Sequence, residues 1–169
     1  MADKKNQPAE GNFTVHPNVQ EKPIGIVATE WNRNIIDKML EGARETLKNN
    51  GIKEEQLVIR DVPGAYELPL GAKYLMEYAQ AQGVICLGCV IKGETNHDRY
   101  INEAVATRLA ELNLTSNLPA IFGILTTDNE AQALARAGGD KGNKGTEAAT
   151  ALLKMLSLKE ELKSRKDRG

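Results

Sequence analysis

Short, unbroken apolar runs alternate along most of this chain with longer segments in which apolar residues recur at helical spacing. A run of this kind is typical of a strand that is buried on both faces. Such strands belong to parallel sheets, because the helices that connect parallel strands cover both faces. The alternation therefore predicts a doubly wound α/β sandwich with right-handed crossovers. We expect its strands at residues 24–29, 57–62, 83–91 and 119–126.

Helical spacing predicts the segments between these strands. One helix is expected over residues 34–50, ended by Gly51, and another over about 98–112. A third is expected over about 67–82, with Leu70, Leu75 and Tyr78 on its apolar stripe. Two last helical segments flank the glycine-rich residues 138–145, which lack the Gly-Lys-Ser/Thr ending and the preceding strand of a P-loop. We therefore exclude nucleoside triphosphate binding there.

A chain of 169 residues is long enough for one full hydrophobic core and short for two. We expect a polar arm over residues 1–22, the α/β domain over 23–158, and a charged tail over 159–169 that ends the last helix. Within the arm, residues 13–15 have the composition of a short strand that pairs with another element.

Composition narrows the classes of function. The residues are 41% hydrophobic and 27% charged, and the formal net charge of −1 gives no reason to expect nucleic acid or a membrane as a partner. No apolar run approaches the roughly 20 residues of a membrane helix. The first residues have no apolar stretch like a secretion signal, so the cytoplasm is the expected location.

Cys86 and Cys89 form a C-x-x-C pair, a spacing that can indicate redox chemistry or zinc. They lie inside an expected strand, where residues three apart point to opposite faces. Redox pairs need a helix start to lower a thiol pKa, and no second pair of Cys or His ligands occurs at zinc spacing. We expect both thiols to be buried structural side chains, and neither a metal nor a cofactor.

Ligands of open parallel sheets bind beyond the carboxyl ends of the strands. Trp31 follows the first strand, where it either packs half-buried or stacks on a flat ring. His97 opens a helix after the third strand, either as a capping or surface residue or as a proton carrier, since histidine titrates near neutral pH.

Three further candidates concern anions and hydroxyls. Residues 93–95 stand at the start of that same helix, where free N–H groups attract an anion, although every helix start has this property. Arg136, among alanines, is either a solvated helix residue or a planar fork for a phosphate or carboxylate. Glu67 either accepts hydrogen bonds from ligand hydroxyls or simply begins a helix.

Taken together, these motifs resemble those of the lumazine synthase family. The similarity covers roughly residues 24–156 and rests on Trp-Asn at 31–32, Val-Pro-Gly-Ala-Tyr-Glu-Leu-Pro at 62–69, Leu-Gly-Cys-Val-Ile-Lys-Gly-Glu-Thr-Asn-His at 87–97, Phe-Gly-Ile-Leu-Thr-Thr-Asp at 122–128, and Arg-Ala-Gly with Gly-Asn-Lys-Gly at 136–145. The resemblance implies a flavodoxin-like three-layer sandwich with a four-stranded parallel sheet. It also implies the condensation of 5-amino-6-(D-ribitylamino)uracil with 3,4-dihydroxy-2-butanone 4-phosphate to 6,7-dimethyl-8-ribityllumazine, phosphate and water.

The resemblance also assigns roles by position. His97 matches the proton donor of the family, and Trp31 matches the aromatic residue, commonly Phe, that stacks on the pyrimidine. The remaining matches are Ala65, Tyr66 and Glu67 for the ribityl chain, Cys89, Val90 and Ile91 for the pyrimidine edge, Glu94, Thr95 and Arg136 for phosphate, and Phe122 for an aromatic segment supplied by the neighbouring subunit. Lys144 and Glu147 match positions near the site whose roles stay open.

Family members are built from rings of five subunits, and some assemble twelve rings into a shell of 60. The short segment 139–145 matches shell-forming members, whereas Pro17 and Pro23 in the arm oppose strand pairing between subunits, so both assemblies stay open. Two other functions are compatible with parts of the sequence. An archaeal-type riboflavin synthase is disfavoured by the complete motif at 93–97, and a non-catalytic flavin- or lumazine-binding shell protein would bind without turnover.

Overall fold

A computed structural model, which describes residues 13–169, contains one four-stranded sheet in which every pairing is parallel. The strands are β1 (Ile24–Thr29), β2 (Leu57–Val62), β3 (Val84–Ile91) and β4 (Ala120–Thr127). Their order in space is β2-β1-β3-β4. The strands lie within about a residue of the apolar runs, and the predicted three-layer α/β fold is confirmed.

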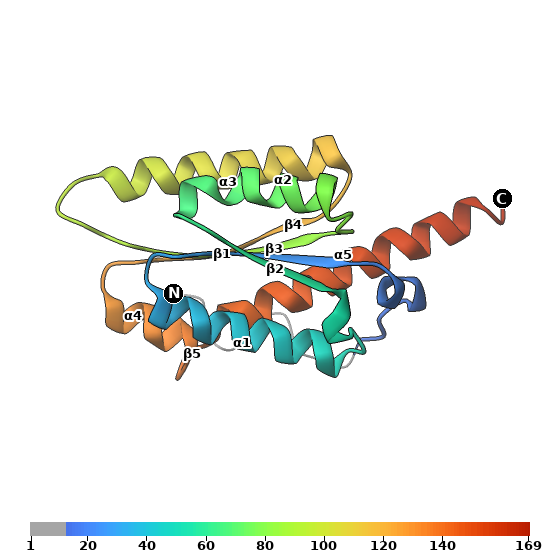
Figure 1. The fold of residues 1–169 in the computed structure, drawn as a ribbon, viewed down its shortest axis with the longest axis horizontal. Coiled ribbons are helices and arrows are strands. Elements are labelled where there is room, and N and C mark those ends of the chain that lie inside the picture. Colours follow the sequence, from blue (N-terminus) through green and yellow to red (C-terminus); the bar gives the residue numbers. More distant parts are fainter. Residues whose placement is uncertain (1–12) are drawn as a thin grey trace.

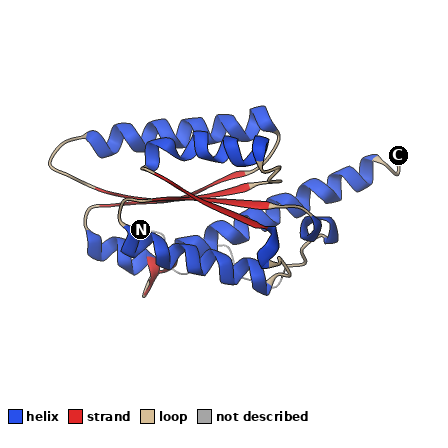
Figure 2. Cartoon of the chain, in the orientation of Figure 1, coloured by secondary structure: helices blue, strands red, loops and turns tan. Residues whose placement is uncertain are grey.

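Helices cover both faces of the sheet (Figure 1). One face carries α2 (Leu68–Tyr78) and α3 (His97–Ser116), and the other carries α1 (Arg33–Asn49), α4 (Glu130–Arg136) and α5 (Lys144–Lys166). Figure 2 shows the strands of the parallel sheet as a single layer between these two helical layers. A small antiparallel hairpin, β5 (Ala137–Gly139) and β6 (Gly142–Asn143), joins α4 to α5. In residues 13–169 no helix has both the length and the apolar character needed to cross a membrane.

The sheet separates two hydrophobic cores. All six residues of β1 are buried, and successive side chains alternate between the cores, with Ile26 under α1 and α5 and Val27 under α2 and α3. Each fully buried aliphatic side chain of this kind contributes roughly 1.5–3 kcal/mol. This double burial explains why the strands read as continuous apolar runs.

The two cysteines diverge as expected. Cys86 belongs to the core under α2 and α3, whereas Cys89 belongs to the opposite core, and both thiols are free. Burial raises the pKa of Cys86 to about 12. Burial and, to a smaller degree, the charge of Glu130 raise the pKa of Cys89 to about 11. Both thiols therefore stay protonated at neutral pH. Nowhere in the described part of the chain do three His, Cys, Asp or Glu side chains gather as a metal site.

The helix after β2 differs from the expectation in length and orientation. It ends at Tyr78, and Gln80 beyond it has a left-handed backbone with a φ of 54°. The expected stripe is wrong, because Leu70 and Tyr78 are exposed. The buried residues start two positions before Leu70 and follow the spacing i, i+4, i+7 and i+8. They are Leu68, Ala72, Leu75 and Met76.

The N-terminal end of the described chain packs against the α/β domain, and the C-terminal end continues its last helix. Val19, in the short 3-10 helix Pro17–Glu21, is fully buried, and the backbone N–H of His16 donates to Ser157 Oγ at 3.1 Å. Residues 13–15 pair with no strand of the described chain, and Phe13 and Val15 are partly buried against the core. Residues 1–12 of the expected arm lie outside the described residues. Helix α5 continues through the expected tail to Lys166, and Figure 1 shows this end projecting beyond the sheet.

Candidate active site

The strand order creates a gap at one point along the carboxyl edge of the sheet. From β1 the chain first adds β2 on one side and then crosses over to β3 on the other. The point where this direction reverses, between β1 and β3, is where open parallel sheets bind ligands. Strand β1 pairs with β3 only up to Ala28 opposite Leu87, whereas β3 pairs with β4 up to Ile91. The last four residues of β3 therefore have a neighbour on one side only.

Backbone groups of β3 face this gap. The N–H of Lys92 donates to Thr127 of β4 at 2.8 Å. Because successive residues of a strand direct their backbone groups to opposite sides, Cys89 and Ile91 direct theirs away from β4. The side-chain amide of Asn32 occupies one of these groups by donating to the Cys89 carbonyl at 2.9 Å. The groups of Ile91 can pair with the edge of a planar ligand.

A cleft of about 540 Å³ opens at this gap. It brings together side chains and backbone from the exits of three strands and from the start of α3. Eight of the residues predicted for the site line it, namely Trp31, Ala65, Tyr66, Glu67, Cys89, Val90, Ile91 and His97.

Trp31 and the exit of β2 form one wall of the cleft. The indole is 73% exposed, and its Cδ1 lies 3.6 Å from the position where a Cβ on Gly64 would stand. The carboxylate of Glu67 accepts a hydrogen bond from the Gly64 N–H at 3.0 Å, which fixes the turn and the carboxylate together. The indole is therefore a free aromatic face beside an anchored acceptor, suited to a ring that carries a hydroxylated chain.

The first turn of α3 also lines the cleft. His97 is the first residue of this helix, and Ile101 lies one turn further along the same face. The imidazole is exposed to solvent and borders the cleft. It can exchange protons with both the solvent and a bound ligand.

Four predicted residues do not line this cleft. Glu94 and Thr95 are exposed in the loop that leads into α3, and Arg136 ends α4. Phe122 stands opposite Cys86 on β4, an edge strand, and is 37% exposed. One copy of the chain therefore gathers the ring-binding and proton-transfer candidates in the cleft, but leaves Arg136 and Phe122 outside it.

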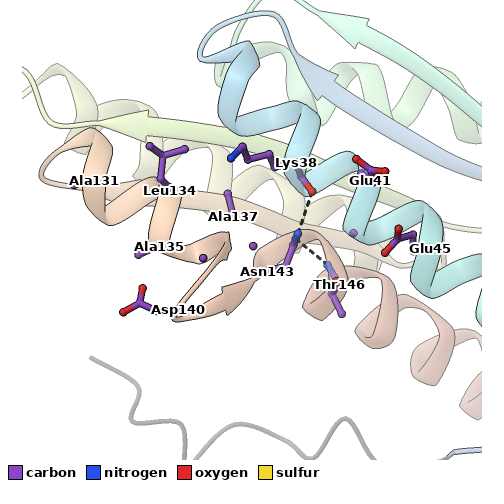
Figure 3. A pocket seen from close by; sticks show the side chains of 13 residues that line it. Lys38, Glu41, Glu45, Ala131, Leu134, Ala135, Ala137, Asp140, Asn143 and Thr146 are labelled. Carbon is purple, nitrogen blue, oxygen red and sulfur yellow. Dashed lines mark hydrogen bonds between the residues drawn. The ribbon is translucent and has the colours of Figure 1, made fainter.

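A second hollow, of about 780 Å³, lies between α1 and the β5–β6 hairpin and contains none of the predicted residues (Figure 3). Its charged lining is mostly acidic, with Glu41, Glu45 and Asp140 against Lys38. None of the residues that line it belongs to a strand of the four-stranded sheet. Its chemistry does not suit a phosphate ester.

Comparison with known proteins shows the family to which the chain belongs. The family model described as 6,7-dimethyl-8-ribityllumazine synthase matches residues 21–160. The chain belongs to this family. Proteins named 6,7-dimethyl-8-ribityllumazine synthase are similar to it over most of their length. The one from Parabacteroides distasonis is 46% identical over 94% of this chain and 99% of its own. The one from Cytophaga hutchinsonii is 50% identical over 83% and 89%, respectively. The family predicted from the motifs is thereby confirmed.

Within this lumazine synthase fold, the structure adds lining residues to which the sequence assigned no role. These are Thr29, Asn32, Pro63, Gly64 and Ile101. Asn32 had a readable signal, because asparagine just before a helix tolerates the left-handed backbone that it adopts here, with φ 57° and ψ 43°. Ile101 had one too, since it follows His97 by one helical turn.

Proposed function

We propose that the cleft between β1 and β3 is where this lumazine synthase family member joins 5-amino-6-(D-ribitylamino)uracil to 3,4-dihydroxy-2-butanone 4-phosphate. The products are 6,7-dimethyl-8-ribityllumazine, phosphate and water. The observation that carries the proposal is the meeting of Trp31, the open backbone of β3 and His97 in one cleft. An enzyme of riboflavin biosynthesis is what the family predicts, and family membership supports it.

The pyrimidine binds against Trp31, whose exposed indole stacks on the ring. Within residues 89–91, the backbone groups that face away from β4 and that Asn32 does not occupy read the edge of the ring. The ribityl chain then lies along Ala65, Tyr66 and Glu67, where the anchored carboxylate accepts hydrogen bonds from its hydroxyls.

The chemistry needs proton transfer and charge stabilisation. The primary amine of the pyrimidine attacks the ketone, and loss of water gives an imine. Loss of the proton on the hydroxyl-bearing carbon and of phosphate from the next carbon then leaves an enol, which tautomerises to a second carbonyl. The secondary amine closes the ring on this new carbonyl with loss of another water. His97 moves protons in these steps, and much of the acceleration comes from holding two substrates in register.

Phosphate binding completes the site across a subunit boundary. Glu94 and Thr95 supply the turn before α3, and Arg136 supplies the guanidinium fork. Since Arg136 and Phe122 lie outside the cleft of their own chain, a second copy is the source that we propose for both. The assembly that we propose is a homopentamer, alone or as one of twelve pentamers in a shell, and these two states differ twelvefold in mass. We place the enzyme in the cytoplasm, in keeping with two free, buried cysteines.

The decisive experiment is product analysis with the two named substrates and purified protein, combined with the sedimentation mass. The expected product is the lumazine, with one phosphate released per lumazine formed. Formation of riboflavin from added lumazine would instead identify a riboflavin synthase. Ligand binding without phosphate release would identify a non-catalytic binding protein.

A further inference from the structure

Arg136, Lys144 and Glu147 form a charged cluster away from the cleft of their own chain. The Glu147 carboxylate lies 3.2 Å from Arg136 Nη2 and 3.3 Å from Lys144 Nζ. Each of the three side chains is only about a quarter exposed, at 26–28%. In every other ion pair of the described residues at least one side chain is about half exposed or more, so the charges of this cluster are better shielded from solvent and interact more strongly.

Hydrogen bonds and strand pairing hold the backbone around the cluster. Arg136 ends α4, and the β5–β6 hairpin turns the chain back so that α5 begins beside it. Asn143 caps α5 by accepting from the N–H groups of Gly145 and Thr146, and its amide donates to the Lys38 carbonyl at 3.0 Å (Figure 3). The two cations are therefore held on a fixed scaffold.

The charges of the cluster do not balance. Two cations share one carboxylate, and the buried Nε of Arg136 has no acceptor among the described residues. A buried donor without an acceptor is unfavourable, and a tetrahedral anion offers several acceptor oxygens at once. The cluster is thus suited to bind a further anion, for which the carboxylate of Glu147 is a competitor.

We propose that Glu147 is a tuning residue that competes with phosphate for Arg136 and Lys144 and so limits the affinity of the site for the phosphate product. This inference rests on the proposed function, in which Arg136 receives the phosphate of the substrate. An enzyme that splits off phosphate must release it before the next turnover. When the Glu147 carboxylate pairs again with Arg136 and Lys144, these cations bind phosphate less tightly, and the product dissociates more readily.

The test is a calorimetric titration of inorganic phosphate into the intact assembly, comparing wild type with Glu147→Gln. The amide keeps the size and an acceptor oxygen but removes the competing charge. We expect the variant to bind phosphate about three- to tenfold more tightly. In steady-state assays, product inhibition by phosphate rises and the KM for the phosphorylated substrate falls, while the KM for the pyrimidine is unchanged. A purely structural role of Glu147 would shift both KM values.

Glu111→Gln is the matched control, because it removes a carboxylate from an arginine pair, with Arg108, on the exposed side of α3. It is expected to leave phosphate affinity unchanged. Equal or weaker phosphate binding by Glu147→Gln would overturn the proposal. If that variant does not assemble, Lys144→Met decides, since it is expected to weaken phosphate binding, and an unchanged affinity would refute the shared site.

The binding readout is independent of turnover. If wild type forms lumazine but binds no phosphate in the titration, the tuning role fails and the proposed function stands. If it binds phosphate in the expected pattern but forms no lumazine, the proposed reaction fails and the anion site remains.

Discussion

Asn32 connects three elements at the floor of the cleft. Its left-handed backbone lies between β1 and α1. Its backbone carbonyl accepts hydrogen bonds from the N–H groups of Ile35 and Ile36 at the start of α1, and its side-chain amide donates to the Cys89 carbonyl of β3. Positive φ costs an ordinary L-residue about 1 kcal/mol or more, and asparagine is among the residues that tolerate it. One side chain therefore connects the exit of β1 to β3 across the gap.

Two substitutions of Asn32 separate the effect of its left-handed backbone from that of its side-chain amide. Asn32→Gly retains the backbone but loses the amide, and Asn32→Ala loses the amide and is strained as well. Both variants should raise the KM for the pyrimidine several-fold, and the alanine variant should be less stable than the glycine variant by about 1 kcal/mol. Steady-state kinetics and chemical denaturation measure the two effects. A wild-type KM in Asn32→Gly would show that the amide does not position the cleft.

His97→Ala tests proton transfer. We expect kcat to fall on the order of 10- to 1000-fold, because a positioned general acid or base contributes an acceleration of this kind. The assembly should be unchanged in sedimentation, since the imidazole is exposed. His16→Ala is the control, because His16 caps the 3-10 helix at Pro17–Glu21 and does not line the cleft. Unchanged turnover in His97→Ala would remove this residue from the mechanism.

Arg136→Ala tests the phosphate contact. The KM for the phosphorylated substrate should rise by about tenfold or more, while the KM for the pyrimidine stays near wild type, because the charged hydrogen bonds of a guanidinium to phosphate are each worth more than about 1 kcal/mol. An equal rise in both KM values would argue that the loss is structural.

At the scale of elements, α5 depends on close contact with α1. A Cβ on Gly145, in the first turn of α5, would stand 1.8 Å from the Met39 carbonyl oxygen in α1. The obstacle is backbone, which no side-chain rotation relieves. The glycine therefore lets the two helices approach, and their contact places Lys144 and Glu147 beside Arg136.

Gly145→Ala should lower the free energy of unfolding by about 3 kcal/mol or more, at the upper end of what overpacking costs. Gly93→Ala is the matched control, because its Cβ would meet nothing within 4 Å. That control should stay within about 0.5 kcal/mol of wild type. Denaturant titrations at one protein concentration compare them, and a stable Gly145→Ala would mean that α5 can shift away from α1.

At the scale of the whole molecule, the three layers bury a thiol on each face of the sheet. Burial raises the pKa of Cys86 from 9.0 to about 12, so this thiol stays protonated in the folded state while it ionises in the unfolded state above pH 9. Its stabilising effect is therefore complete below pH 9 and is lost as the pH rises towards 12. Between pH 8 and 10 the loss is about 1 kcal/mol.

Cys86→Ala isolates this effect. The free energy of unfolding of the variant should fall by about 1 kcal/mol less than that of wild type between pH 8 and 10, when both are measured at the same protein concentration. Identical pH dependence in the two proteins would show that Cys86 ionises as readily in the folded state as in the unfolded one.

Much of the fold was predictable because its signals are local. A strand buried on both faces must be apolar throughout, which placed β1 to β4 within about a residue. The stripe of α2 was not predictable in the same way. Leu70 and Tyr78 are as apolar as the residues that α2 buries, and only the packing against β1 and β3 selects the face.

The site was predictable in part for a related reason. The ends of parallel strands share one edge, so Trp31, Glu67 and His97 were expected near one another, and the cleft brings them together. Arg136 ends α4 and lies outside the cleft of its own chain, a placement that depends on how α4 packs and that no local signal specifies. The pairing of Arg136 with Glu147, eleven residues away, follows from a hairpin whose path the sequence does not state.

The sequence by itself determined the class of fold, the order of the elements along the chain and the family, because apolar periodicity and the motifs at the strand ends are written in consecutive residues. Only the tertiary structure decided the strand order β2-β1-β3-β4, the overrun of β3 past β1, and the cluster of Arg136, Lys144 and Glu147. These depend on contacts between residues far apart in the chain, whose energies are settled by packing and charge in three dimensions.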